Sequence, residues 1–276
     1  MTVHSPSPQR EQARLQPVFD TCHAEARAAL VGYLPSGYPD KDGSKELFAA
    51  LVEGGCDIIE VGIPYSDPVM DGPTIQAAAD AALKAGFRVR DVLGTVEHIS
   101  NSGGSAVVMT YWNPVLKYGV DAFARDLASA GGLGLITPDL IPEEAGEWIE
   151  ASRTHDLDRI FLVAPSSTEE RIALTADVSR GFLYAASTMG VTGARDAVST
   201  SAPDLVARVR AHSDIPIGIG LGVRSGAQAA EIARYADGVI VGSALVAAAQ
   251  NGPAAMAELT RELAAGVRGA AQSATV

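Results

Sequence analysis

The chain has 276 residues, of which 47% are hydrophobic and 20% charged, so it can bury a sizeable core as one large domain or two small ones. Its formal net charge of −12 argues against a nucleic-acid or membrane-surface partner, because those partners attract clustered lysine and arginine. No apolar run approaches the roughly 18 residues of a membrane helix, and the segment before Cys22 lacks the apolar core of a secretion signal. Cys22 and Cys56 are not part of any CxxC or Cys/His cluster, so neither a disulfide framework nor a structural zinc is predicted. We therefore expect a cytoplasmic protein.

Short apolar runs recur along the chain, and segments with helical periodicity separate them. The runs predict strands at residues 28–34, 57–63, 105–111, 133–137, 159–164, 182–187, 215–222 and 237–243. The intervening segments carry Leu, Ile, Val and Ala at spacings of three and four, with charges on the remaining face, which predicts helices. Strands that alternate with helices pair in parallel through right-handed crossovers, and strands apolar at nearly every position are typical of a sheet covered on both faces.

Eight such units in a row favour an α/β fold of the (β/α)8 type, a TIM barrel built as a single domain. The alternative is an open doubly wound sheet, which normally has a glycine-rich turn after its first strand. Here that strand is followed by PSGYPD, which lacks the GxGxxG spacing. We expect residues 25–268 to form the barrel, residues 1–24 to be a flexible or helical extension, and residues 269–276 to be a flexible tail. Functional side chains of a barrel gather at the carboxyl ends of its strands.

Glu60 interrupts the second predicted strand, in the stretch DIIEVGI. Because strand side chains alternate, Ile58 and Glu60 share one face, and the β-branched Ile59 and Val61 suit the face covered by helices. Glu60 then points into the barrel near its mouth. An unpaired buried carboxylate costs on the order of several kcal/mol unless it is protonated, and carboxylates tuned in this way serve as general acids or bases. The pattern therefore predicts a functional role for Glu60.

The loop YSDPVMDGP follows that strand and adds Asp67 and Asp71. SDP and DGP are ordinary turn sequences, and we interpret Asp67 as a turn residue. Asp71 can cap the helix that follows, but it also lies in the loop directly above Glu60. Two carboxylates over one barrel mouth allow two separate proton-handling roles.

Glycines cluster in the loops after the last three predicted strands. Gly222 allows close approach of the backbone to a ligand, and Gly242 and Ser243 stand where a helix begins with free N–H groups. Barrel enzymes often hold phosphate in the loops after their last two strands, so the pattern indicates a phosphate site. Arg224, next to these glycines, either assists this site or faces solvent.

The residues that are missing from the strands narrow the chemistry further. No lysine lies in a predicted strand, so a Schiff base with substrate or pyridoxal phosphate is not predicted, and the histidines form no metal site by spacing. Tyr33, Tyr111 and Tyr184 lie in or at the ends of strands and either fill the core or wall a flat apolar substrate. The reaction class that these exclusions leave uses no metal, binds its substrate through a phosphate group and relies on carboxylates for catalysis.

Four segments, EVGIPYSDPVMDGPTIQ, FLYAASTMGVTGARD, GIGLGVRS and DGVIVGSALV, give the chain a specific resemblance to the α subunit of tryptophan synthase. The likeness runs over nearly all of the chain after residue 25. This resemblance implies a (β/α)8 barrel that cleaves indole-3-glycerol phosphate to indole and glyceraldehyde 3-phosphate without a cofactor of its own. It also implies a β-subunit partner that carries pyridoxal phosphate and receives the indole, in an αββα complex.

The same resemblance implies the site residues. Glu60 would handle protons at indole C3 and at the glycerol hydroxyl, and Asp71 would bind the indole N–H and stabilise the positive charge that develops when C3 is protonated. Tyr184 lies near these groups in the family. The implied phosphate-binding residues are Gly193, Gly222, Gly242 and Ser243, and the implied pocket residues are Tyr33, Tyr111, Ile136, Leu162 and Thr192.

The chain departs from the family pattern at a few positions. Tyr33 stands where phenylalanine is common, and Trp112 and Pro138 replace small residues, which bears on the shape of the pocket. The loops 65–73 and 187–196 have the length and glycine content of lids that close over substrate. In the family these loops also communicate with the β subunit, so the resemblance implies weak activity alone and strong activation by that partner. Two alternatives are a stand-alone indole-3-glycerol phosphate lyase and a non-catalytic barrel that only activates a β subunit. A different phosphate-binding barrel, such as an isomerase, fits the DGPTIQ and GVTGA matches less well.

Overall fold

The computed structural model describes residues 12–186, 201–220 and 222–273. Within them, parallel strands alternate with helices along the chain. The strands are β1 (Ala29–Pro35), β2 (Ile58–Gly62), β3 (Ala106–Met109), β4 (Gly134–Ile136), β5 (Asp158–Ile160), β6 (Leu162–Val163), β7 (Leu183–Ala186), β8 (Ile217–Gly220) and β9 (Gly238–Val241). The helices are α1 (Gln16–Ala24), α2 (Lys41–Gly54), α3 (Pro73–Lys84), α4 (Asp91–Asn101), α5 (Trp112–Tyr118), α6 (Val120–Ser129), η1 (Pro142–Glu144), α7 (Gly146–Thr154), α8 (Glu169–Val178), α9 (Ser201–Arg210), α10 (Gly226–Ile232), α11 (Ser243–Ala249) and α12 (Pro253–Ser273).

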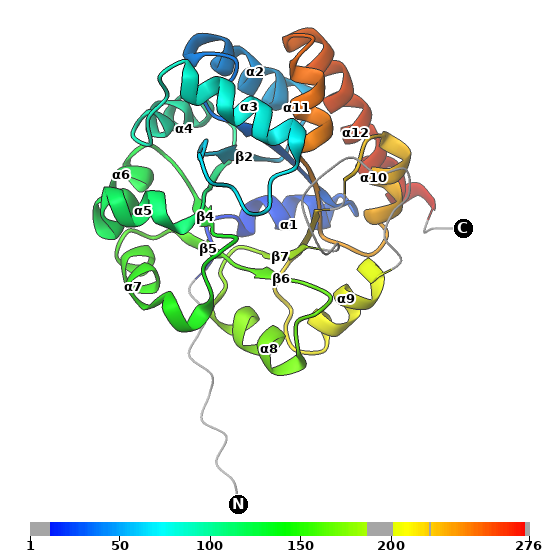
Figure 1. Ribbon diagram of the computed structural model, residues 1–276. Helices are drawn as coiled ribbons and strands as arrows, with labels where there is room; N and C mark the ends of the chain where they lie inside the picture. Colours follow the sequence, from blue (N-terminus) through cyan, green and yellow to red (C-terminus); the bar gives the residue numbers. More distant parts are fainter. Residues whose placement is uncertain (1–11, 187–200, 221, 274–276) are drawn as a thin grey trace, which may run out of the picture.

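The strands form one parallel sheet that curls into a barrel inside a ring of helices (Figure 1). Neighbouring strands follow the order β5-β4-β3-β2-β1-β9-β8-β7-β6. The two outermost strands, β5 and β6, are separated only by Phe161, so this one stretch of chain pairs with β4 on one side and with β7 on the other. The predicted (β/α)8 TIM barrel is therefore confirmed. Its fifth predicted strand, 159–164, is divided into two short strands because it changes pairing partner at Phe161.

The side chains of the strands fill two cores. One lies between the strands and the helices and includes Leu34, Ile59 and Val61. The other lies inside the barrel and includes Ile58 and Ile136 with apolar residues of neighbouring strands. Alternate residues of β2 thus belong to different cores, which is what a strand covered on both faces requires.

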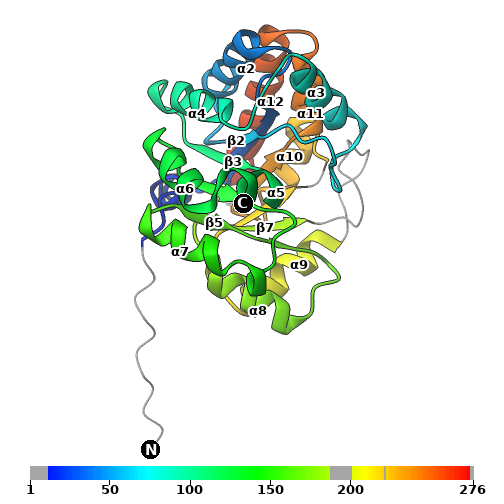
Figure 2. The ribbon, with the colours of Figure 1, turned by 60° about the vertical axis from the view of Figure 1, so that its left-hand side comes forward.

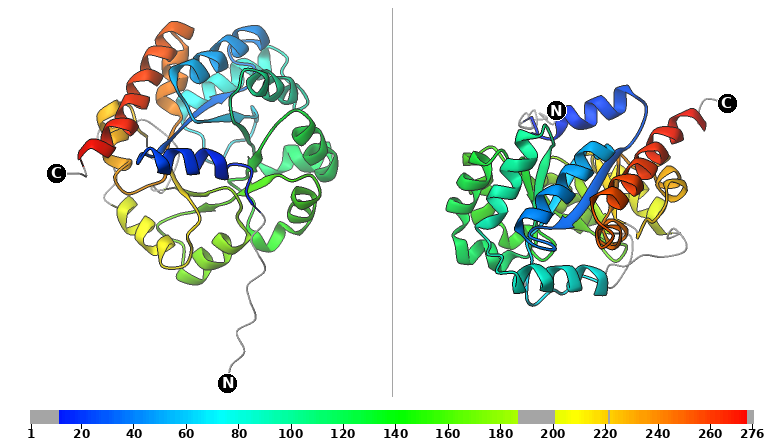
Figure 3. Two further views of the ribbon diagram at one scale, coloured as in Figure 1. Left: turned by 180° about the vertical axis from the view of Figure 1, so that it is seen from behind. Right: turned by 90° about the horizontal axis from the view of Figure 1, so that it is seen from above.

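Helix α1 lies across one end of the barrel (Figure 3). Its Phe19 and Cys22 extend the interior core, and the Phe19 ring lies 6.0 Å from that of Phe182. The buried carboxylate of Asp158 accepts hydrogen bonds from the backbone amides of Arg14, at 3.0 Å, and Leu15, at 2.8 Å. These contacts close the amino-terminal end of the strands, and they leave the carboxyl end for a ligand.

The carboxylate of Asp57, directly before β2, fixes the start of this strand through hydrogen bonds and an ion pair. Asp57 accepts the backbone amide of Leu30 at 2.8 Å and two hydrogen bonds from the Arg27 guanidinium, at 2.8 and 2.9 Å. The resulting register places Glu60 beside Tyr33 of β1. The position of the central carboxylate is therefore set by ordinary strand pairing.

The last helix, α12, packs against α2 and α10 and continues to Ser273. The sequence predicted a flexible tail from residue 269, but Ala270 is buried, so the helix extends beyond that boundary. Within the described residues, no helix is both long and apolar enough to cross a membrane. Figure 2 shows α12 among the helices that surround the strands.

Candidate active site

Glu60 lies in the middle of β2, and its side chain is only 1% exposed. It occupies the same strand face as Ile58, which belongs to the interior core, so it points into the barrel. Its Oε2 atom has no hydrogen-bond partner among the described residues. Burial, together with the nearby negative charge of Asp71, raises the pKa of Glu60 to about 8. A carboxyl group with this pKa can give and take a proton at neutral pH.

Asp71 lies in the loop between β2 and α3 and is half-buried. Burial raises its pKa, and a hydrogen bond from the Tyr111 hydroxyl acts in the opposite direction. Its charge acts on Glu60, so the structure brings the two predicted carboxylates into one electrostatic site. Asp67, in the same loop, accepts a hydrogen bond from the Ser66 hydroxyl at 2.6 Å, which is a local turn contact.

Tyr111 holds the loop that carries Asp71. Its hydroxyl oxygen accepts the backbone amides of Val69 at 3.2 Å and Met70 at 2.9 Å. Its ring stacks at a tilt against Tyr65, with 5.2 Å between the centroids. The residue was predicted as core filler or as a pocket wall, and its role as a loop anchor was missed because its partners lie about 40 positions away in the sequence.

Two further tyrosines flank Glu60. The Tyr33 ring covers the Cα of Gly62, where an added Cβ would lie 2.5 Å from the Tyr33 hydroxyl, and Tyr184 covers Gly220 in the same way. Burial raises the pKa of both tyrosines well above the usual value, and the charge of Glu60 adds to this effect. Both hydroxyls therefore stay neutral and can donate hydrogen bonds inside the site. The two glycines are required because any side chain would collide with these rings.

Two of the predicted pocket residues lie on strands β4 and β6. Ile136 ends β4 and Leu162 begins β6, and both contribute to the interior apolar cluster that Tyr184 also contacts. Tyr111, directly before α5, is buried. Thr192, predicted for the same pocket, lies outside the described residues.

Three of the four predicted phosphate-binding residues follow β8 and β9. Gly222 has a φ of +63°, a left-handed conformation that favours glycine. Gly242 directly precedes α11, where a Cβ would lie 3.5 Å from the Tyr33 ring, and the buried Ser243 begins the helix. The first amides of α11 have no partner within their own helix. Gly193 lies outside the described residues, so three of the four predicted residues can be placed.

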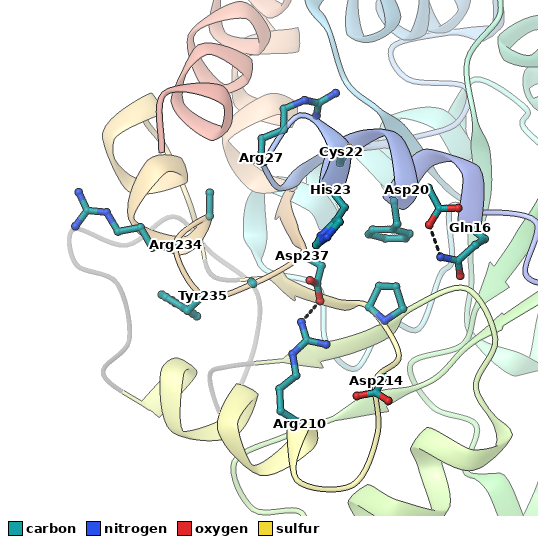
Figure 4. A pocket seen from close by; sticks show the side chains of 15 residues that line it. Gln16, Asp20, Cys22, His23, Arg27, Arg210, Asp214, Arg234, Tyr235 and Asp237 are labelled. Carbon is teal, nitrogen blue, oxygen red and sulfur yellow. Dashed lines mark hydrogen bonds and ion pairs between the residues drawn. The ribbon is translucent and has the colours of Figure 1, made fainter. Parts of the chain in front are cut away.

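Within the described residues, no group of three or more His, Cys, Asp or Glu side chains has the arrangement of a metal site. A separate hollow of about 820 Å³ lies on the α1 side of the barrel, against the turns before β8 and β9 (Figure 4). Arg210 pairs with Asp237 inside it, and Gln16 donates to Asp20 at 2.7 Å. This hollow is at the opposite end of the barrel from the site around Glu60.

Comparison with known proteins decides the family. The sequence profile described as "Tryptophan synthase alpha chain" matches residues 19–275. The chain belongs to the tryptophan synthase alpha chain family. Tryptophan synthase alpha chains of Mycobacterium marinum and Mycobacterium tuberculosis are each 72% identical to it over 260 residues, which is 94% of this chain and 97% and 96% of the relatives.

Solved structures of tryptophan synthases share the fold of this alpha-chain family member. One from Mycobacterium tuberculosis superposes with a TM-score of 0.91 at 70% identity, covering 94% of this chain and 99% of the other. A chain of the tryptophan synthase complex from Pyrococcus furiosus superposes with a TM-score of 0.79 at 32% identity, covering 86% and 98%. The resemblance expected from the four sequence segments is thus confirmed.

Proposed function

We propose that this alpha chain cleaves indole-3-glycerol phosphate to indole and glyceraldehyde 3-phosphate, with Glu60 and Asp71 as the catalytic carboxylates. The observation that carries the proposal is the buried Glu60, which lacks a partner for Oε2 and has its pKa raised to about 8 beside a second carboxylate. Such a group is prepared for proton transfer and has little value as a structural residue.

Cleavage requires two proton movements. Protonation of indole C3 makes the ring an electron sink, and loss of the proton from the adjacent glycerol hydroxyl forms the aldehyde as the carbon–carbon bond breaks. We assign both proton transfers to Glu60. Asp71 accepts the indole N–H and stabilises the positive charge that develops on the ring. Tyr184, covering Gly220 near Glu60, supplies a neutral hydroxyl in the same site.

The remaining residues hold the substrate. Tyr33, Tyr111, Ile136 and Leu162 are assigned to the walls of the pocket for the flat indole ring, and Thr192 is assigned to the same pocket. Backbone amides at Gly222, Gly242 and Ser243, with Gly193, are assigned to the phosphate group, because glycine lets the backbone approach closely and the first amides of α11 lack helical partners. This arrangement lets an acidic protein bind an anionic substrate.

A β subunit is the proposed partner, and the pyridoxal phosphate of the second reaction is assigned to it, in an αββα complex. The partner's docking face is assigned to the carboxyl end of β2, β3 and β4. Val69, Leu116 and Ile141 follow these three neighbouring strands and are 69%, 50% and 44% exposed. Exposed large apolar side chains on segments that follow adjoining strands are typical of an interaction surface.

Indole release measured with and without β subunit tests the proposal. We expect slow release by the chain alone and faster release in the complex. Glu60→Gln should reduce single-turnover cleavage at least a thousandfold in both cases and leave substrate binding within a few-fold, since shape and phosphate contacts survive. Equal release with and without partner would favour a stand-alone lyase. Turnover that survives in Glu60→Gln would remove Glu60 from its role, and no cleavage by the unaltered complex would favour a barrel that only activates its partner.

A further inference from the structure

A small hollow lies on the side of the barrel, between the segment that leads into α4 and helix α5. Its volume is about 430 Å³, which is within the range of small-molecule sites. Its lining consists of Arg88, Val89, Arg90, Pro114, Lys117 and Tyr118. In Figure 1, α4 and α5 lie on the same side of the ring. We refer to it as the α4–α5 hollow.

Half of the residues that line the α4–α5 hollow are cations. Arg88, Arg90 and Lys117 are exposed, and none of the three forms an ion pair with a carboxylate among the described residues. The Arg88 side chain donates to the carbonyl oxygen of Phe87 at 2.9 Å, which orients it without neutralising it. In a chain with a net charge of −12, three cations without an ion-pair partner among the described residues form a local positive site around this hollow, and Asp91 is the carboxylate on which Arg90 acts at longer range.

Two carboxylates adjoin the α4–α5 hollow, and both already have partners. Asp91 accepts the backbone amide of Arg88 at 2.8 Å and pairs with Lys41 at 2.9 Å. Asp126 accepts the Tyr118 hydroxyl at 2.7 Å and pairs with Arg125 at 2.8 Å. The positive charge of the lining is therefore available to a ligand.

The rest of the lining is apolar and rigid. Pro114 is buried in α5, Val89 is half-buried, and the Tyr118 ring is fixed at both ends. Its hydroxyl is bonded to Asp126, and its ring packs edge-on against Phe123 at 5.6 Å. An apolar floor with a cationic rim suits a ligand that has a flat apolar body and one anionic group, because arginine binds planar carboxylates with paired N–H groups.

We propose that the α4–α5 hollow binds a small aromatic carboxylate, at a site separate from the one around Glu60. Its carboxylate lies between Arg90 and Lys117, and its ring lies against Pro114 and Tyr118. The proposal does not depend on the reaction assigned to the chain, since none of these residues belongs to the proposed catalytic or phosphate-binding groups.

The test is a titration of the full-length, isotopically labelled chain with benzoate, followed by the backbone amide resonances at constant ionic strength. We expect saturable shifts at residues 88–91 and 115–119. The double variant Arg90→Gln/Lys117→Gln should weaken these shifts at least tenfold, because two charge-assisted contacts are lost. Arg153→Gln/Arg261→Gln removes the same charge from α7 and α12, where both side chains are exposed, and should leave the affinity unchanged.

Benzamide is a control ligand that has the same ring but no charge, and it can be titrated into the unaltered chain. It should bind at least tenfold more weakly than benzoate. The proposal is overturned if benzamide and benzoate bind equally, if the shifts lie only around Glu60, or if the two double variants behave alike. Because Arg90 and Lys117 are exposed, we expect both variants to keep the amide dispersion of the folded chain.

Discussion

The two ends of the barrel contain buried carboxylates in opposite situations. At the closed end, Asp158 is fully buried and accepts the amides of Arg14 and Leu15, and the Arg180 guanidinium lies 3.2 Å away. At the open end, Glu60 is almost equally buried, yet its Oε2 has no partner among the described residues. Burial raises the pKa of both groups, but only at Asp158 do hydrogen bonds and an opposite charge act against it.

This difference distinguishes Asp158, a carboxylate with a structural role, from Glu60, a carboxylate suited to catalysis. The partners of Asp158 are backbone amides and an arginine that the fold supplies, so its function is to fix the chain before α1 onto the barrel. The missing partner of Glu60 is a group that a substrate can supply. A buried carboxylate is therefore informative about function only when its hydrogen bonds are considered as well.

The largest expected effect on stability comes from Asp158→Asn. The amide nitrogen would face a backbone N–H or Arg180 and leave buried donors without acceptors, so we expect a loss of about 2 kcal/mol in the free energy of unfolding. Turnover of the folded protein should stay within about twofold. Urea denaturation and indole release measure the two quantities.

Asp156 provides the matched control for that substitution. It also pairs with Arg180 and Arg14, but its side chain is 59% exposed. Asp156→Asn should therefore cost less than about 0.5 kcal/mol. If the two variants lost equal stability, the assignment of Asp158 as the anchor of the closed end would be wrong.

A smaller effect is expected from Tyr111→Phe at the open end. The change removes the acceptor of the Val69 and Met70 amides and the hydrogen bond that lowers the pKa of Asp71. We expect kcat to fall about tenfold, and the acid limb of its pH profile to move to higher pH because the Asp71 pKa rises further. Tyr65→Phe keeps the stacked ring and, among the described residues, loses the hydrogen bond from Asn113 alone, so its pH profile should stay in place. Identical profiles for both variants would contradict the anchoring role of Tyr111.

The sequence predicted the parts of this picture that depend on local pattern. The alternation of Ile58, Ile59, Glu60 and Val61 predicted which side chain enters the barrel, and the apolar runs predicted the strands. Contacts between distant segments left no such signal. The Tyr111 hydroxyl bonds to the loop after β2, and Phe161 changes the pairing partner of its strand, because of how the closed barrel brings strands together.

The central claim is that the fold makes the ionised state of Glu60 unfavourable and favours its protonated state, and the pH dependence of stability tests this claim most directly. A folded-state pKa near 8, above the ordinary value of 4.5, means that the stability contributed by protonated Glu60 is complete below pH 4.5 and is lost as pH rises through 8. Glu60→Gln removes this dependence. The account predicts that the variant equals the unaltered chain in unfolding free energy near pH 4 and exceeds it by at least about 1 kcal/mol near pH 8. A difference that does not change between these pH values would contradict it.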